Sequence, residues 1–478
     1  MKRFAALSLI SKKYCCTHHF VIIVSALHTL FMRLAWVFLL SFVFYSSCHN
    51  DTAKRQAVRQ NKLERTAQAA KKRHDDSLNA FRIPEIADTR YRARPAMRDF
   101  NDTVARPAPL MVGAERLEEY LHLLHGKNVA LVVNPTSMIG HRHLVDTLSS
   151  IGVKLVKVFA PEHGFRGTGN AGEHVAAERD EFTGISVISL YGQKTKPSTA
   201  DLSGIDIVVY DIQDVGVRFY TYISTLHYVM EACAENGVPL LVLDRPNPNG
   251  HYVDGPVLKP ELRTFVGVDP IPVVHGLTIG EYALMINGEN WLTGGKQCAL
   301  TVVPCSRYNH RLFYNLPVKP SPNLPTMRAI YLYPSLCLFE GTCVGVGRGT
   351  DLPFESFGHP DAVLGSYSFM PAPNSGAKKP LHEGRTCRGF RLDTLSIDSL
   401  RAHPKLDLSY ICSFYNAFPD KSRFFLHTNF FGDLIGNNDV KYYIQAHQPP
   451  EQIRQTWQPE LTAYKEKRRR YLLYPDFE

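Results

Sequence analysis

Short runs of β-branched residues alternate with helical stretches from residue 129 onward, and this alternation constrains the fold more than any other feature of the chain. Five runs, residues 129–134, 154–160, 186–190, 205–211 and 239–244, predict buried strands. Apolar residues at helical spacing occupy 143–151 and 223–236, and Gly237 supplies a stop after the second stretch. Strands that alternate with helices are typical of an open, mostly parallel α/β sheet.

The second half of the chain has a different pattern. Residues 276–287 predict another helix and residues 300–304 another strand, but from about residue 329 the elements are mixed. There the sequence predicts a strand at 390–395 and helices at 408–418 and 453–471. We therefore expect an α/β domain over residues 109–328 and a smaller α+β domain over residues 329–478.

Chemically rich loops follow three of the predicted strands. Open α/β sheets bind ligands at the carboxyl ends of their strands, so these loops are the place to look for a site. They span residues 161–167, 211–222 and 244–250. Their candidate site residues are Glu162, His163, Arg166, Asp211, Asp214, Arg218, Tyr220, Tyr222, Asp244, Arg245 and Asn247.

Glu162 is the sharpest catalytic candidate. It lies at a predicted strand end in a glycine-rich loop, where the backbone allows close approach of a bulky substrate. A partly buried carboxyl group beside His163 has a pKa that can be tuned for general acid catalysis, with His163 tuning or orienting it. The alternative is a glutamate that only stabilises its loop by accepting hydrogen bonds from backbone amides.

A second carboxylate would complete a glycoside hydrolase site. Such enzymes place two carboxyl groups about 5 Å apart for retention or about 6.5–9.5 Å apart for inversion. Asp211, Asp214, Asp244 and Glu340 are the candidates. Spacing in the sequence leaves open which of them it is, and with it the stereochemical outcome.

Arginines and tyrosines are the candidates for substrate binding. The planar fork of Arg166, Arg218, Arg245 or Arg348 suits bidentate recognition of a carboxylate. An ion pair with a neighbouring aspartate is an equally good interpretation of each. Tyr220 and Tyr222 offer flat faces and hydroxyl groups of the kind that sugar sites use.

Several cofactor and enzyme classes are not favoured. The run Gly345-x-Gly347-x-Gly349 is not a dinucleotide-binding fingerprint, and no phosphate-binding loop follows a predicted strand. No Cys-x-x-Cys pair or His spacing predicts a metal site. Neither His-Glu-x-x-His nor Gly-x-Ser-x-Gly is present. We therefore expect the protein to use neither a nucleotide nor a metal ion as a cofactor.

The positive charge of the chain is concentrated at its beginning. The formal net charge is +9, yet residues 1–47 carry five bases and no acid, and residues 49–110 carry 14 bases and 8 acids. Residues 111–478 therefore carry a net charge of −2. A body without excess positive charge argues against nucleic acid as a partner.

The first residues predict export and attachment to a membrane. Met32 and Arg33 precede an apolar run over residues 34–45, and small residues lead to Cys48, where a lipoprotein signal peptidase would cut. Met32 is a possible true start, and an uncleaved anchor helix is the alternative. Residues 49–108 are charged and interrupted by prolines, which predicts a tether. We expect segments 1–48 and 49–108 to deliver a periplasmic, membrane-tethered lipoprotein.

Several motifs together resemble the exo-β-N-acetylmuramidases of the NamZ type. Besides the three loops, they include residues 321–326, Glu340 within 339–342, and Arg348 and Asp351 within 347–355. The resemblance covers roughly residues 110–478. It implies a Rossmann-like sheet domain followed by a smaller auxiliary domain, a site in the cleft between them, and no nucleotide cofactor.

The resemblance also implies an activity and a substrate. The family hydrolyses a terminal, non-reducing N-acetylmuramic acid from peptidoglycan fragments, and its proposed catalytic glutamate matches Glu162. Muramic acid carries a lactyl carboxylate, which Arg218 or Arg348 could bind. The alternative function is a lipoprotein that binds muropeptides without turnover. Oligomeric state has no signal in these motifs.

Overall fold

The computed structural model describes residues 109–162, 164–166 and 178–478 of the 478-residue chain. The expected signal segment, Cys48, the tether and His163 therefore lie outside the described residues. No helix within the described ranges is both long and apolar enough to span a membrane.

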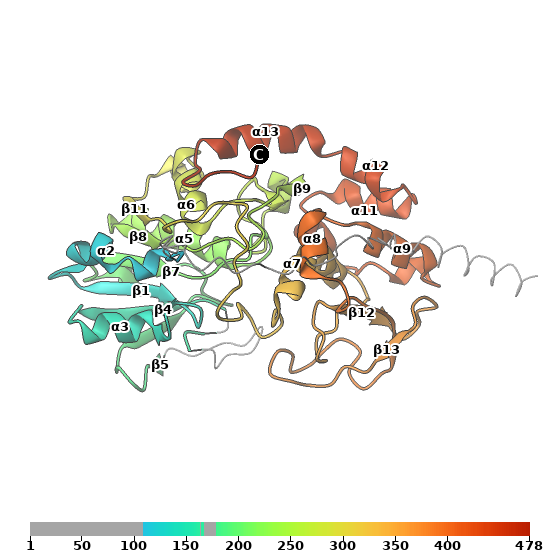
Figure 1. The fold of residues 1–478 in the computed structure, drawn as a ribbon, viewed down its shortest axis with the longest axis horizontal. Coiled ribbons are helices and arrows are strands. Elements are labelled where there is room, and N and C mark those ends of the chain that lie inside the picture. The colour runs from blue at the N-terminus through green and yellow to red at the C-terminus, as the bar shows by residue number, and fades with distance from the viewer. Residues whose placement is uncertain (1–108, 163, 167–177) are drawn as a thin grey trace, which may run out of the picture. The chain divides into compact units, whose positions relative to one another are not determined.

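A seven-stranded sheet forms the first half of the described chain (Figure 1). In spatial order its strands are β11 (Leu300–Val303), β8 (Leu240–Leu243), β7 (Ile207–Asp211), β1 (Val129–Val133), β4 (Leu155–Ala160), β6 (Ser186–Ser189) and β5 (Glu178–Arg179). All neighbours pair in parallel except β5, which is antiparallel to β6. Starting from β1, the chain adds β4 and β6 on one side, then β7, β8 and β11 on the other. This is the Rossmann strand order, and the predicted fold class is confirmed.

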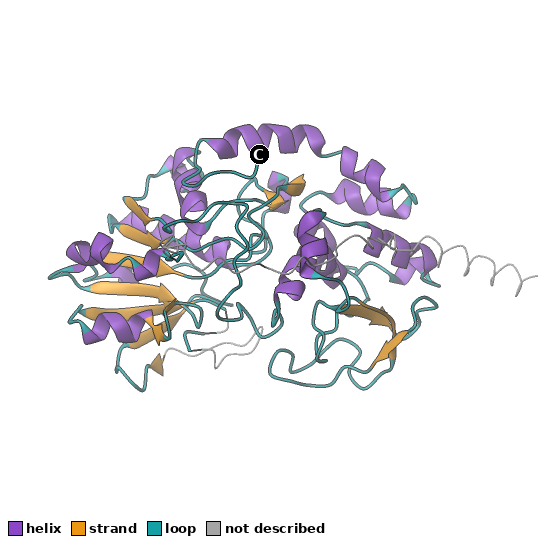
Figure 2. Cartoon of the chain, viewed as in Figure 1, coloured by secondary structure: helices purple, strands orange, loops and turns teal. Residues whose placement is uncertain are grey.

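Helices cover both faces of this sheet (Figure 2). The helices of this half are α2 (Leu117–Leu124), α3 (Leu144–Ser150), α4 (Thr199–Leu202), α5 (Tyr222–Asn236) and α6 (Ile279–Gly288). Residues of β1 alternate between the faces: Val129 and Leu131 pack with α2 and α3, whereas Ala130 and Val132 pack with α5 and α6. Because both faces are buried, the strands consist almost wholly of apolar residues.

Two local signals set the ends of the helices on the second face. Helix α5 ends at Gly237, which adopts the left-handed conformation (φ 66°) that a helix stop favours. Helix α6 begins with a capping box in which the Thr278 side chain accepts from the Glu281 amide and the Glu281 side chain accepts from the Thr278 amide. Both helices agree with the predicted ranges to within three residues.

The second half is built around a small antiparallel sheet. Strands β12 (Ser356–His359) and β13 (Tyr367–Phe369) flank β14 (Cys387–Arg391), which lies a few residues before the predicted strand at 390–395. A further antiparallel pair, β9 (Asp254–Val257) and β10 (Pro272–Val274), precedes it in the chain. The helices are α7 (Met327–Leu336), the 3₁₀ helix η4 (Cys337–Gly341), α8 (Ile397–Ala402), α9 (Ser409–Ala417), α10 (Phe430–Ile435), α11 (Asn438–Gln445), α12 (Pro450–Gln455) and α13 (Gln458–Arg469).

The prediction of a single helix over residues 453–471 is wrong, because this part of the chain forms two helices, α12 and α13. Pro459 occupies the first turn of α13, where its missing N–H is tolerated but would interrupt a longer helix. The break also buries Trp457, whose indole donates to Asp254 Oδ1 at 3.1 Å.

Helix α13 and the residues after it return to the first half of the chain (Figure 1). The Tyr464 hydroxyl donates to the carbonyl oxygen of His275 at 2.8 Å, and the Arg468 guanidinium donates to that of Gly276 at 2.7 Å. The Tyr474 hydroxyl donates to Asp244 Oδ2, directly after β8, at 2.5 Å. The end of the chain is thus part of the framework that carries the sheet.

Candidate active site

A small cavity of about 70 Å³ lies where the loops after β4 and β7 meet the second half of the chain. It is lined by Glu162, Phe219, Tyr220, Thr221, Tyr222, Ser321, Asn323, Leu324, Tyr333, Arg348 and Phe354. The sheet domain supplies the acid and the loop that precedes α5, and α7 and the loop after η4 supply the opposite side. The carboxyl ends of parallel strands therefore carry this site, as the fold leads one to expect.

Glu162 is surrounded by hydroxyl groups. It follows β4 by two residues, and the Thr221 hydroxyl donates to its Oε2 at 3.3 Å. Burial and the nearby Glu162 carboxylate raise the pKa of Tyr191 and of Tyr222 above the ordinary tyrosine value. Both phenols therefore stay protonated, and the Tyr222 hydroxyl donates to the carbonyl oxygen of Pro320 at 3.4 Å.

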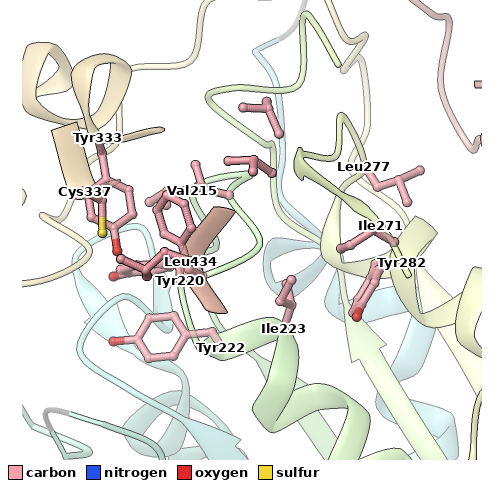
Figure 3. Packing of buried hydrophobic residues seen from close by; sticks show 14 of the residues in the cluster. Val215, Tyr220, Tyr222, Ile223, Ile271, Leu277, Tyr282, Tyr333, Cys337 and Leu434 are labelled. Atoms are coloured by element: carbon pink, nitrogen blue, oxygen red, sulfur yellow. The ribbon is translucent and has the colours of Figure 1, made fainter. Parts of the chain in front are cut away.

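Three tyrosines pack against one another beside the acid. Figure 3 shows Tyr220, Tyr222 and Tyr333 in the buried cluster, with ring centroids 4.8 Å apart for Tyr220 and Tyr222 and 6.0 Å apart for Tyr220 and Tyr333. The Tyr220 hydroxyl donates to the carbonyl oxygen of Pro320 at 2.8 Å. That bond fixes the start of the segment whose residues Ser321, Asn323 and Leu324 line the cavity.

Arg348 contributes the positive charge of the cavity. Its Nε donates to Glu340 Oε1 at 2.5 Å, and its guanidinium carbon lies 5.0 Å from the centroid of the Phe354 ring. Burial lowers the pKa of Arg348, but the Glu340 carboxylate outweighs burial and raises it, so the group stays charged. Within the described residues the bond to Glu340 uses only Nε, which leaves the two terminal nitrogens for another acceptor.

Other predicted site residues hold the strand-end loops together. Asp211 and Arg245 form a buried ion pair with N–O distances of 2.6 and 2.9 Å. Asp214 is buried and accepts from the Gly216 amide at 2.6 Å, while Asn247 donates to the carbonyl oxygen of Leu277 at 2.8 Å. None of these four is among the residues that line the cavity.

Asp244 is buried and is not among the residues that line the cavity. It accepts from the Thr278 hydroxyl at 2.7 Å, from the Gly280 amide at 2.8 Å and from Tyr474. Burial raises the pKa of Asp244 to about 6, although these hydrogen bonds act in the opposite direction. A carboxyl group in this position joins β8, α6 and the end of the chain.

The expectation that Arg218 binds substrate needs correction. Arg218 is fully buried and donates to three carbonyl oxygens, those of Pro256 at 3.0 Å, Ile271 at 2.7 Å and Leu434 at 2.9 Å. It therefore connects the β9–β10 pair to α10 and does not line the cavity. Nothing in the neighbouring sequence predicts that this arginine is buried among carbonyl groups.

The two remaining predicted binding residues also lie elsewhere. Arg166 pairs with Asp180 at 2.7 Å and with Asp146 at 2.9 Å, so the alternative interpretation, an ion pair, applies to it. Asp351 is exposed and is not among the cavity-lining residues. Of the predicted residues, the cavity brings together Glu162, Tyr220, Tyr222 and Arg348, with Glu340 bonded behind Arg348.

Sequence reasoning missed several residues of the site. Thr221 and Phe219 belong to the chemically rich loop after β7 but are not titratable, so they attracted no attention. Tyr191 follows β6 by two residues, and the rule that sites lie at carboxyl ends of strands could have found it. Tyr333 and Phe354 come from the second half of the chain, where no local signal connects them to Glu162.

The described residues contain no group of three or more His, Cys, Asp or Glu side chains that could hold a metal ion. The seven cysteines in this part of the chain are all free thiols, and all but Cys343 are buried. The described lining of the cavity offers a carboxyl group, hydroxyl groups and an arginine.

Strand order and cavity define a class: a Rossmann-type α/β protein whose site, at the carboxyl ends of the strands, is completed by a C-terminal domain. The chain belongs to the NamZ family. Models of the N-terminal and C-terminal parts of exo-beta-N-acetylmuramidase NamZ match residues 129–328 and 331–474. The resemblance seen in the motifs is confirmed.

Similar proteins cover most of the chain. The peptidoglycan beta-N-acetylmuramidase NamZ of Bacillus subtilis (strain 168) is 37% identical over 407 residues, which are 80% of this chain and 95% of that protein. A crystal structure of a DUF1343 family protein from Bacteroides fragilis NCTC 9343 has a TM-score of 0.72 at 43% identity and covers 77% of this chain and 100% of its own. A second such protein from the same strain has a TM-score of 0.65 at 28% identity, covering 76% and 99%.

Proposed function

We propose that the chain is an exo-acting glycoside hydrolase that releases terminal, non-reducing N-acetylmuramic acid from peptidoglycan fragments. The observation that carries the proposal is the position of Glu162: the motif glutamate of a NamZ family member lies in a hydroxyl-lined cavity that both domains complete.

Glu162 supplies the proton in the proposed reaction. The bond between the anomeric carbon and the bridging oxygen breaks, and the Glu162 proton goes to that oxygen. The oxygen of a water molecule bonds to the anomeric carbon, and the proton that this water loses goes to Glu162 or to the second carboxylate. The Thr221 hydroxyl, 3.3 Å from Oε2, orients the carboxyl group. His163, which lies outside the described residues, is proposed to tune or orient the Glu162 carboxyl group, as expected from the sequence.

Glu340 is the best-supported second carboxylate. Asp211, Asp214 and Glu340 all accept internal hydrogen bonds, but of the three only Glu340 is bonded to a residue that lines the cavity, Arg348. In this proposal Glu340 stabilises positive charge that develops on the sugar, or activates water. Arg348 binds the lactyl carboxylate that distinguishes muramic acid from glucosamine.

The substitution Glu162→Gln tests the catalytic assignment. It keeps the size of the side chain and its bond to Thr221 but removes the acidic proton, and general acid catalysis contributes about 10²–10⁴-fold. We expect kcat on an aryl N-acetylmuraminide to fall by at least about a hundredfold. Glu383→Gln, at an exposed position far along the chain, is the matched control. Turnover near that of the unmodified protein in Glu162→Gln would refute the role of Glu162.

We also propose that the protein is exported, tethered through a lipid on Cys48, and active in the periplasm on cell-wall fragments. The support is the apolar run over residues 34–45 that ends at Cys48. Cells fed labelled palmitate should incorporate label into the unmodified chain and into Cys343→Ser, but not into Cys48→Ser. An unlabelled chain in the cytosolic fraction would contradict the proposal.

A further inference from the structure

Three aromatic side chains outside the hydrophobic core form a row beside the candidate active site. The Tyr191 and Phe265 rings have centroids 6.3 Å apart in an edge-to-face arrangement, and the Phe265 and Tyr228 rings are stacked with centroids 6.2 Å apart and planes 6° apart. All three side chains are partly exposed. Val266, the neighbour of Phe265, packs on the core, but these three rings do not belong to it.

This row begins at the catalytic acid and leads away from it. Tyr191 is close enough to Glu162 for the two groups to interact, and it follows β6 at the same edge of the sheet. Thr221, which donates to Glu162, precedes α5, and Tyr228 comes seven residues later on the same helical face. Seven residues advance a helix by about 10 Å, so Tyr228 lies roughly two turns away from the acid.

Phe265 is held firmly at the centre of the row. It occupies a turn in which Thr264 and Gly267 exchange backbone hydrogen bonds of 3.0 Å. Arg263 Nε donates to the carbonyl oxygen of Val268 at 2.5 Å, and a Cβ atom on Gly267 would lie 3.3 Å from Arg218 Nε. The buried Arg218 therefore packs close to this turn, and a backbone held in this way is already ordered before a ligand binds.

The proposed reaction indicates which part of the substrate such a surface would bind. An exo-acting hydrolase encloses the terminal sugar, and its acid must reach the oxygen that joins this sugar to the next one. The second sugar, the aglycone, consequently lies just beyond Glu162, where the row begins. Flat aromatic faces suit the apolar face of a sugar ring, and rigid aromatic residues contribute contact area at low entropic cost.

We propose that Tyr191, Phe265 and Tyr228 form the subsite for the aglycone sugar, an N-acetylhexosamine with an intact ring. The proposal rests on the function proposed above, since it assigns the second sugar of that same substrate. Stacking on Phe265 and Tyr228 selects fragments whose leaving group is a sugar.

The test compares two substrates that differ only in the leaving group: a disaccharide of N-acetylmuramic acid linked to N-acetylglucosamine, and methyl β-N-acetylmuraminide. For Phe265→Ala and Tyr228→Ala we expect the ratio of kcat/KM on the disaccharide to kcat/KM on the methyl glycoside to fall about tenfold. Phe265→Leu, which is apolar but not flat, should lose the preference, and Phe265→Trp should keep it. Tyr442→Ala, at an exposed tyrosine on α11, is the matched control.

The outcomes separate this proposal from the proposed function. If Glu162→Gln is inactive but the ratio is unchanged in Phe265→Ala and Tyr228→Ala, the subsite is wrong and the function stands. If those variants lose activity only on substrates that carry a stem peptide, the row binds peptide, which also overturns the subsite. Phe265→Leu with an unchanged ratio would likewise overturn it, since size alone would then suffice.

Discussion

Arg348 shows how one residue of this site can be both fixed and available. Its Nε is bonded to Glu340, and its guanidinium carbon lies 5.0 Å from the centroid of the Phe354 ring, so both contacts hold the guanidinium in place before any substrate arrives. The two terminal nitrogens remain for a ligand in the cavity. Arg218, the other candidate for the same role, donates from both of its terminal nitrogens to carbonyl groups of the framework.

We expect Arg348→Ala to reduce the selectivity for muramic acid. A hydrogen bond to a charged group contributes about 1.5–3 kcal/mol, which corresponds to roughly a 10- to 150-fold effect. The ratio of kcat/KM on an N-acetylmuraminide to that on the matching N-acetylglucosaminide should fall by this factor. Arg348→Lys should retain part of it, because a charge remains but the planar fork is lost.

Arg391→Ala removes an exposed arginine paired with Asp393 and is the matched control for Arg348→Ala. An unchanged ratio in Arg348→Ala would mean that the lactyl group is recognised elsewhere. A loss of all activity with the ratio preserved would point to a role through Glu340 instead.

At the level of elements, the strands could be predicted well and the site only in part. Residues 129–133 and 207–211 are buried on both faces, so an unbroken apolar run identifies each strand without tertiary information. Glu162, Tyr220 and Tyr222 were accessible to the same reasoning, because they follow strand ends. Arg218 was not, since its acceptors lie up to 216 residues away along the chain.

The ends of the helices likewise have both local and distant causes. Gly237 ends α5 through its own backbone conformation, and this could be predicted. The break between α12 and α13 depends on Pro459, a local signal, and on the bond from Trp457 to Asp254, a partner 203 residues away. Only the first of these two causes can be recognised from the neighbouring sequence.

At the scale of the whole molecule, Asp244 connects the sheet to the end of the chain and gives stability a pH dependence. Burial raises the pKa of Asp244 to about 6, from an ordinary value of 3.8. The folded state therefore binds this proton more tightly than the unfolded chain does. The contribution to stability is fully present below about pH 4 and is lost as the pH rises through about 6.

Asp244→Asn should remove this pH dependence, because the amide stays neutral and the Thr278 and Tyr474 hydroxyls can accept as well as donate. Two pKa units correspond to roughly 3 kcal/mol at most. The free energy of unfolding is measured in urea at pH 4 and at pH 7. Between these two pH values we expect it to fall by about 2 kcal/mol more for the unmodified protein than for Asp244→Asn. Exposed Asp398→Asn is the control, and parallel pH profiles for Asp244→Asn and the unmodified protein would contradict the assignment.

The bond between Tyr474 and Asp244 also makes the sheet sensitive to cleavage far from the cavity. Asp244 directly follows β8 in the first domain, and Tyr474 follows α13, 230 residues further along the chain. A protease that cut between α13 and Tyr474 would leave every residue that lines the cavity in place. It would nevertheless remove one contact from the carboxyl edge of the sheet, on which Glu162 also lies.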